Sequence, residues 1–243
     1  MTAAADCPEP ASFDPGGVAV VVGASGALGG ALADQLNQDA CFAQVVGLSR
    51  RSDPPLDLIR EDTIAAAVRH VADLGLPLRL VVDATGFLHD EAFLPEKSWR
   101  QIDPVHMAHT FAINAIGPAL LMKHFLPLLP ATGKSVFATL SARVGSIADN
   151  RLGGWHGYRA SKAALNQIVR TCAIELRRTR PQAICVALHP GTVESSLSAP
   201  FTKSGLVVRP PTEAASDLLR TVSGLMPECS GGFYDYAGAP VPW

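Results

Sequence analysis

Short apolar runs alternate with segments of helical periodicity along most of the chain, and this alternation constrains the fold more than any other feature. The first run, GVAVVV at residues 17–22, is typical of a strand that is buried on both faces. Further strands are predicted at residues 44–48, 78–83, 135–140, 183–188 and 232–236. Helices are predicted at residues 27–37, 63–74, 106–129, 158–178 and 212–225. This order predicts an α/β fold with a Rossmann-type, doubly wound parallel sheet of about seven strands and helices on both faces.

The length of the chain suits one domain of this kind. With 243 residues the chain can form a full hydrophobic core, and 48% of its residues are hydrophobic while only 6% are aromatic. Small aliphatic side chains suit a tightly packed parallel sheet. We expect residues 1–15 to form a flexible N-terminal segment and residues 16–243 to form a single domain. Within it, residues 190–211 are long enough to form a mobile lid over a site.

Charge and cysteine content argue against several classes of function. The 20 basic and 22 acidic residues give a formal net charge of −2, which leaves no positive excess for nucleic acid. The five cysteines form no C-x-x-C pair and no cluster with histidine at metal-ligand spacing. No signal-peptide core follows the N-terminus, and the apolar stretch at residues 115–130 falls short of a bilayer span. We expect a cytoplasmic protein without a metal site that binds neither membranes nor nucleic acid.

A glycine-rich turn follows the first predicted strand. Gly23, Gly26 and Gly29 stand in G-x-x-G-x-x-G spacing directly before a helix. Gly23 permits a tight turn, Gly26 lets the backbone approach a pyrophosphate, and Gly29 allows the helix to pack closely on the strand. The free N–H groups of the helix start would bind phosphate. Such turns also serve packing alone, but the position after the first strand favours a dinucleotide site.

The end of the second predicted strand indicates which dinucleotide would bind. An acidic residue here would hold the ribose of NAD, but the sequence reads Ser49-Arg50-Arg51. Two arginines offer planar donors for a 2′-phosphate, so NADP (as NADPH) is favoured over NAD. The alternative is a pair of solvated surface arginines.

Tyr158 and Lys162 lie four residues apart near the start of the predicted helix 158–178, so their side chains share one helix face. A neighbouring ammonium group lowers the pKa of a phenol from about 10 and brings it nearer to the range that proton transfer at neutral pH requires. Tyrosine and lysine meet at this spacing in many helices, so the pair indicates a site only together with other motifs.

In their order along the chain, these motifs closely resemble those of the short-chain dehydrogenase/reductase family, and the resemblance spans residues 17–243. The glycine turn matches the family's cofactor turn, and Asn114 matches the helix asparagine of its proton relay. The segment 83–86, Asp-Ala-Thr-Gly, replaces the family's Asn-Asn-Ala-Gly. Residues 141–162 and 231–235 are most similar to the C-factor branch, which takes part in cell–cell signalling.

The resemblance implies a set of cofactor contacts along the whole chain. Asp57 and Leu58 match the segment that touches the adenine, and Ser195 stands in place of the threonine that meets the nicotinamide carboxamide. The full implied set is Gly23, Ser25, Gly26, Ala27, Leu28, Gly29, Ser49, Arg50, Arg51, Asp57, Leu58, Ala84, Thr85, Gly86, Asn114, Tyr158, Lys162, Pro190, Gly191, Val193 and Ser195.

The resemblance also implies a catalytic set of Asn114, Ser141, Tyr158 and Lys162. Tyr158 would give a proton to a substrate carbonyl oxygen that a serine hydroxyl also contacts. Lys162 would hold the nicotinamide ribose, and Asn114 would position a water molecule.

The serine of this set has three candidates. Alignment on Gly145 puts Ala142 in the catalytic position, whereas alignment on the strand puts Ser141 there, and Ser146 is a further hydroxyl nearby. We assign the role to Ser141, the nearest hydroxyl.

We therefore expect an oxidoreductase that transfers a hydride between NADP(H) and a carbonyl or alcohol substrate. The alternative is a signalling or sensor protein of the same fold that binds the cofactor with little or no turnover. The sequence leaves open the substrate, the physiological direction and any signalling role. Relatives usually pair through their two long helices, so we expect a homodimer or homotetramer. Candidate residues for the substrate pocket are Leu88, Val144, Trp155, His156 and Phe201.

Overall fold

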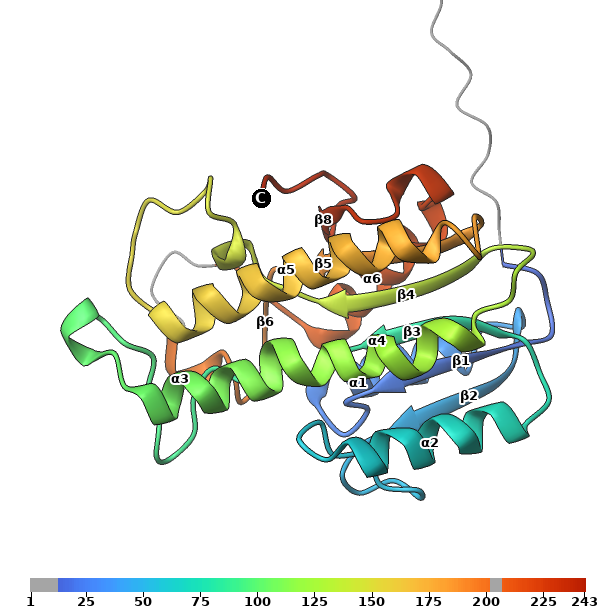
Figure 1. Cartoon of the computed structure of the whole chain (residues 1–243), viewed down its shortest axis with the longest axis horizontal. Coiled ribbons are helices and arrows are strands. Elements are labelled where there is room, and N and C mark those ends of the chain that lie inside the picture. Colours follow the sequence, from blue (N-terminus) through green and yellow to red (C-terminus); the bar gives the residue numbers. More distant parts are fainter. Residues whose placement is uncertain (1–12, 202–206) are drawn as a thin grey trace, which may run out of the picture.

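A parallel sheet of six strands forms the centre of the computed structural model, which describes residues 13–201 and 207–243 (Figure 1). Its strands, from one edge to the other, are β2 (Phe42–Leu48), β1 (Gly17–Val22), β3 (Leu78–Asp83), β4 (Ser135–Leu140), β5 (Ala183–His189) and β8 (Phe233–Asp235). All neighbouring strands are parallel. The strand order reverses between β1 and β3, and in open α/β sheets ligands bind at the carboxyl ends of the strands beside such a reversal.

Helices cover both faces of the sheet (Figure 1). On one face, α2 (Glu61–Asp73), α4 (Gly117–Phe125) and α5 (His156–Leu176) pack on a core that contains Val18, Val20 and Phe137. On the other face, α1 (Ala27–Leu36) and α6 (Pro211–Gly224) pack on Ala19 and Val21. Successive residues of β1 thus serve opposite layers, as the period of two in a strand requires. The predicted doubly wound α/β fold is confirmed.

The helix predicted at residues 106–129 is a continuous segment with a local change in winding. It consists of α3 (Pro104–Phe111), a π-helical turn at Ala112–Ile116, α4, and a 3-10 turn at Leu126–Leu128. By length and composition alone, Pro104–Leu128 could span a membrane. In the fold, however, Leu121, Met122 and Phe125 are fully buried against the sheet. The π-helical turn contains Asn114, and such turns occur frequently at functional sites.

Two features of the sheet differ from the sequence-based expectation. The main sheet has six strands instead of about seven, and residues 49–60 after β2 form no strand. Pro54 and Pro55 lie in this segment, and proline removes the N–H groups that a strand ladder needs. A second small sheet pairs β6 (Thr192–Val193) with β7 (Val208–Arg209) inside the predicted lid. Residues 202–206 of that lid lie outside the described residues, and its mobility stays a prediction.

Packing of the N-terminal region begins earlier than predicted. Residues 1–12 lie outside the described residues, but Phe13 and Asp14 belong to the segment that we expected to be flexible. The ring of Phe13 is buried and contacts the ring of Phe42, with 5.4 Å between their centroids. Asp14 forms an ion pair with Arg79 at 2.9 Å. These contacts move the boundary of the packed domain to residue 13, whereas the single-domain expectation stays a prediction.

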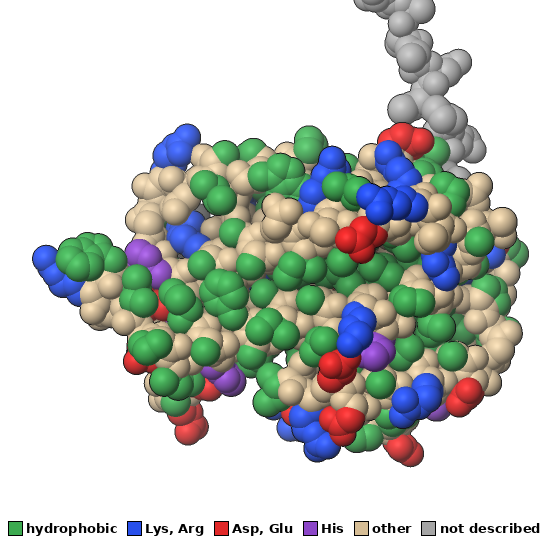
Figure 2. Space-filling view, viewed as in Figure 1, with side chains coloured by type: hydrophobic (Ala, Val, Ile, Leu, Met, Phe, Trp, Pro, Cys, Tyr) green, Lys and Arg blue, Asp and Glu red, His purple; other side chains and the backbone are tan. Residues whose placement is uncertain are grey.

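Figure 2 shows apolar side chains gathered over the face on which α4 and α5 lie. Ile116, just before α4, and Ile174 in α5 are 54% and 49% exposed. Large exposed apolar side chains on one face are typical of surfaces that associate with another protein. Pairing of two copies through these helices stays a prediction.

Candidate active site

The glycine-rich turn forms as the sequence predicts. Gly23 has a φ of +85°, and its N–H donates to Leu48 O at the end of β2 (2.8 Å). Gly26 N–H donates to Gly23 O (2.9 Å), and α1 begins at the next residue without any side-chain cap. A Cβ atom at Gly29 would overlap the carbonyl oxygen of Gly23, so only glycine allows this approach. The uncapped helix start therefore leaves its N–H groups available to an anion.

Ser49, Arg50 and Arg51 lie beside this turn because they directly follow Leu48, the residue whose carbonyl binds Gly23. Ser49 Oγ accepts from the N–H of Arg51 (3.1 Å), which shapes the bend after β2. Both arginines are exposed, and within the described ranges neither guanidinium forms an ion pair or a side-chain hydrogen bond. Their donors are thus free to bind a ligand at the turn.

The segment after β3 closes the other side of the turn. Ala84 N–H donates to Val22 O (2.9 Å), and a Cβ atom at Gly23 would lie 3.1 Å from Ala84 O. Asp83 is fully buried, where its carboxylate accepts from Thr139 Oγ1 (2.6 Å) and Thr85 Oγ1 (2.5 Å). Burial raises the pKa of Asp83, and the hydrogen bonds from the two threonines oppose that rise. The side chains of Asp83 and Thr85 in the Asp-Ala-Thr-Gly segment therefore have hydrogen-bond partners within the fold.

Asp57 and Leu58 differ in their surroundings. Leu58 is buried in the core, and a Cβ atom at Gly117 would lie 2.8 Å from its own Cβ. Asp57 is half-buried, and its side chain accepts from the N–H of Ile59 (3.2 Å). Of the two residues that we expected to touch the adenine, only Asp57 therefore has its side chain near the surface.

Asn114, Lys162 and Gly86 meet at the carboxyl ends of β3 and β4. Asn114 Oδ1 accepts from Phe87 N–H and its Nδ2 donates to Phe87 O, both at 2.7 Å. Lys162 Nζ donates to Leu140 O, the last residue of β4, at 2.7 Å. A Cβ atom at Gly86 would lie 3.9 Å from Lys162 Nζ and 4.0 Å from Asn114 Oδ1. The buried side chains of Asn114 and Lys162 thus lie on either side of the exposed backbone at Gly86.

Tyr158 lies in the first turn of α5, with its ring centroid 6.0 Å from Lys162 Nζ. Burial raises the pKa of Tyr158 to about 12 and lowers the pKa of Lys162 to about 8. The net shift of the Tyr158 pKa is therefore upward, whereas the neighbouring Lys162 led us to expect a downward shift. The reason is that desolvation dominates, while the ammonium group is directed to Leu140 O. At neutral pH the phenol consequently keeps its proton and can donate it.

The start of α5 is held by Glu96, a residue that sequence reasoning missed. Both carboxylate oxygens of Glu96 lie 3.2 Å from Gly157 N, and its backbone carbonyl accepts from Trp155 N–H (2.5 Å). Trp155 has a φ of +52°, and α5 has no cap from its own sequence. Because Glu96 is 61 residues away from Gly157, no local pattern could have indicated it. Through this contact Glu96 fixes the turn that carries Tyr158.

The hydroxyl of Ser141 does not face the site. Its Oγ donates to Asn166 Oδ1 (2.7 Å) inside the core, and Asn166 lies eight residues, or about 12 Å of helix, beyond Tyr158. The Oγ of Ser146 instead accepts from Asp149 N–H (3.1 Å). The structure thus contradicts the substrate contact expected of Ser141, because strand alternation turns this side chain toward α5. Ala142, the other candidate position, carries no hydroxyl.

Aromatic side chains gather near Tyr158. The ring of Trp155 lies 6.2 Å from that of Tyr158 and 5.2 Å from that of Phe201, and His89 lies 5.2 Å from Phe201. Trp155 and Phe201, two of the residues predicted to line the substrate pocket, are therefore in contact. His89 belongs to the same cluster but was not among the predicted pocket residues. Among the described residues no contact between aromatic rings joins His156 to this cluster.

The segment after β5 forms a tight turn. Gly191 has a φ of +77°, which favours glycine. Val193 O accepts from Ser198 Oγ (2.6 Å) and from Ser195 Oγ (3.4 Å). Pro190, Gly191, Val193 and Ser195 thus follow the carboxyl end of β5, at the edge of the sheet where the other predicted cofactor residues lie.

Comparisons with known proteins agree with the fold. A family model described as enoyl-(acyl carrier protein) reductase matches residues 30–213. The C-signal of Myxococcus xanthus is 40% identical over 143 residues, which are 58% of this chain and 81% of that protein. A 1-hydroxy-2-glutathionyl-2-methyl-3-butene dehydrogenase from Rhodococcus is 28% identical over 79% of this chain and 80% of its own. The NADPH-bound carbonyl reductase from chicken fatty liver superposes with a TM-score of 0.82 at 22% identity, covering 98% and 100% of the two chains.

The six-stranded Rossmann-type sheet, with its polar site at the carboxyl ends of the strands, and these matches together define an oxidoreductase. The chain belongs to the short-chain dehydrogenase/reductase family, as its motifs predicted, and it is similar to the C-factor branch of that family.

Proposed function

We propose that the protein is an NADP-dependent dehydrogenase/reductase that interconverts a carbonyl compound and its alcohol. The observation that carries this proposal is the placement of Tyr158, Lys162 and Asn114 at the carboxyl ends of β3 and β4, next to Gly86. The name of the chicken relative, an NADPH-bound carbonyl reductase, supports the same reaction and cofactor. Turnover of NADPH with a panel of aldehydes, ketones, quinones and keto esters tests the proposal.

The chain fits a dinucleotide at the glycine turn. Gly29 lies so close to the carbonyl of Gly23 that no side chain fits between them. The start of α1 has no side-chain cap, so its N–H groups are available to a pyrophosphate. Arg50 and Arg51 would bind the 2′-phosphate of NADP with donors that have no other partner among the described residues. Tyr158 and Lys162 would hold the nicotinamide half.

The reaction needs a hydride and a proton at one C=O group, and NADPH supplies the hydride when it is bound. Tyr158 Oη gives its proton to the carbonyl oxygen, since its raised pKa keeps the phenol protonated at neutral pH. The positive charge of Lys162 favours the phenolate that remains. Asn114 fixes the segment after β3 through its two hydrogen bonds to Phe87. Trp155 lies beside Tyr158, and Phe201 packs on Trp155, so that these rings would exclude water from the substrate.

A cofactor-binding sensor with little turnover is a second candidate, and one observation favours it. The hydroxyl of Ser141 donates to Asn166 Oδ1 within the protein, so it is not free to donate to the carbonyl oxygen. Loss of one hydrogen-bond donor to a developing oxyanion lowers kcat by about 10² to 10³. Saturable NADPH binding without turnover of any carbonyl compound would favour the sensor.

We expect the protein to bind NADPH in preference to NADH, and we expect Arg50→Asp to remove that preference. Charge-assisted hydrogen bonds to the 2′-phosphate contribute a factor of about 10 to 100 in Kd, and a carboxylate at this position would repel the phosphate. Thermal-shift titration with both cofactors measures the preference. Arg69→Asp, a change at an exposed arginine of α2, is the matched control. Equal stabilisation of the wild type by NADPH and NADH would contradict the role of Arg50.

The two candidate serine positions are expected to respond differently to substitution. Ser141→Ala leaves Asn166 Oδ1 without its donor, so we expect the free energy of unfolding to fall by about 1 to 3 kcal/mol with little change in kcat. Ala142→Ser introduces a hydroxyl where family alignment places the catalytic one, so we expect kcat to rise by up to about 10²-fold. Chemical denaturation and steady-state kinetics measure the two effects. A collapse of kcat in Ser141→Ala, with stability unchanged, would restore the original assignment.

A further inference from the structure

A cavity of 290 Å³ lies at the carboxyl ends of β5 and β8. Gly191, one of the predicted cofactor contacts, lines it, whereas none of the predicted catalytic residues does. Its lining includes Arg143, His189, Thr192, Arg209, Asp235 and Tyr236. It adjoins the proposed active site because Leu140 and Leu188 are paired in register, and His189 follows Leu188. Lys162 donates to the carbonyl of that same Leu140.

Two buried polar atoms of the cavity's lining residues have no hydrogen-bond partner within residues 13–201 and 207–243. These are Nδ1 of His189 and Nη1 of Arg209. Burying a polar group without a hydrogen bond is costly, and native proteins rarely do so. Two such atoms on residues of one cavity therefore indicate a ligand that supplies their partners.

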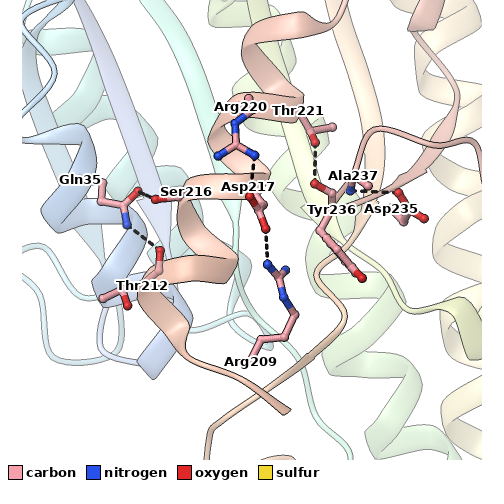
Figure 3. A network of polar contacts seen from close by, with 10 residues as sticks. All are labelled: Gln35, Arg209, Thr212, Ser216, Asp217, Arg220, Thr221, Asp235, Tyr236 and Ala237. Carbon is pink, nitrogen blue, oxygen red and sulfur yellow. Dashed lines mark hydrogen bonds and ion pairs between the residues drawn. The ribbon is translucent and has the colours of Figure 1, made fainter. Parts of the chain in front are cut away.

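The guanidinium group of Arg209 is held in place from two sides (Figure 3). Nη2 of Arg209 forms a short ion pair with Asp217 of α6. The central carbon of the guanidinium group, Cζ, lies 4.1 Å from the ring centroid of Tyr236. Asp217 also pairs with Arg220 at 2.7 Å, so its charge is shared between two arginines. Nη1 of Arg209, which has no hydrogen-bond partner among the described residues, is therefore held as a fixed donor for a ligand.

The other titratable groups of the cavity are close to charge balance. Burial lowers the pKa of His189 to about 4, so the imidazole is neutral at pH 7 and can present an N–H at Nδ1. Asp235 accepts from the N–H groups of Ala237 and Ala239, both at 3.0 Å, and faces Arg143 at 3.4 Å. Because these contacts already balance the negative charge of Asp235, we favour a ligand with a single negative charge over a more highly charged one.

We propose that this cavity binds the carboxylate of the substrate, so that the protein acts on carbonyl compounds that carry a carboxylic acid. One carboxylate oxygen would accept from Arg209 Nη1 and the other from an N–H of His189. The inference rests on the proposed function, because the carbonyl group of the same molecule would then lie toward Tyr158.

The test compares aldehydic acids of increasing chain length with their methyl esters, using NADPH as the reductant. For at least one chain length we expect kcat/KM to favour the acid over its ester by about 10- to 100-fold, the effect of a charge-assisted hydrogen bond. Arg209→Lys keeps a cation for Asp217 but removes Nη1, and we expect it to bring the ratio of acid to ester close to one. Arg220→Met removes the other partner of Asp217 outside the cavity and should leave the ratio unchanged.

Isothermal titration with the corresponding hydroxy acids separates this inference from the proposed reaction. If no carbonyl compound is reduced, the proposed function fails, yet acid-selective binding that Arg209→Lys abolishes would still support the carboxylate site. Equal binding or turnover of acid and ester by the wild type would overturn it. An acid preference that survives Arg209→Lys would overturn it as well.

Discussion

Replacing Tyr158 by phenylalanine is expected to lower kcat by about two to four orders of magnitude, the usual contribution of a positioned general acid. The phenol keeps its proton at neutral pH because burial raises its pKa to about 12, and it lies in the first turn of α5 near Lys162. The substitution removes only the hydroxyl group and leaves the ring packed against Trp155. The Kd of NADPH should therefore stay within a few-fold of the wild-type value.

Tyr234→Phe is the matched control for this experiment. This substitution also removes a partly buried phenol hydroxyl. Tyr234 lies in β8, however, and its hydroxyl donates to Cys229 O (3.4 Å). We expect the control to keep wild-type kcat. Steady-state kinetics and cofactor titration on both variants measure the difference. Full kcat in Tyr158→Phe would show that another group supplies the proton.

The second large effect is expected at the glycine turn. In Gly29→Ala the new Cβ atom would overlap the carbonyl oxygen of Gly23, which is backbone and cannot rotate away. Either α1 or the turn must shift, and overpacking of this kind costs about 1 to 3 kcal/mol. We expect the melting temperature to fall by several degrees, at about 2–4 °C per kcal/mol. NADPH affinity should fall at least about tenfold, because the N–H groups at the start of α1 lose their alignment.

Gly30→Ala provides the control from the neighbouring position. A Cβ atom there meets Ala24 O at 3.4 Å, an ordinary contact, and alanine stabilises a helix interior by about 0.5 to 1 kcal/mol relative to glycine. The melting temperature of this variant should equal or exceed that of the wild type, with NADPH affinity preserved. Melting curves and cofactor titration compare the two. Equal losses in both variants would mean that the turn has no special role.

The layered fold could be predicted from the sequence because each main strand is a short apolar run. The sequence places β1, β3 and β4 at the bounds that the structure shows. The number of strands was missed by one, because the apolar runs indicate six strands while the overall prediction was about seven. The short pair β6 and β7 was also missed, because two residues give no detectable periodicity.

The site was predictable only where a local motif fixes geometry. The turn at Gly23 and the pair of Tyr158 and Lys162 depend on spacing within one element, and both form. The surroundings of Ser141 depend on Asn166, and those of Tyr158 depend on Glu96 and on burial. Such contacts join residues that are 25 or more positions apart, so no local pattern records them. The cavity at Arg209 was missed for the same reason, since its walls come from four separate segments.

The central claim is that the chain transfers a hydride from NADPH to a carbonyl compound with Tyr158 as the proton donor. The most direct measurement uses NADPH that carries deuterium at its transferable position, with the panel of aldehydes, ketones, quinones and keto esters, followed by mass spectrometry of the products. We predict deuterium on the carbinol carbon of at least one product with the wild type, and its loss with Tyr158→Phe. Saturable NADPH binding with no deuterium in any product would contradict the claim and favour the sensor.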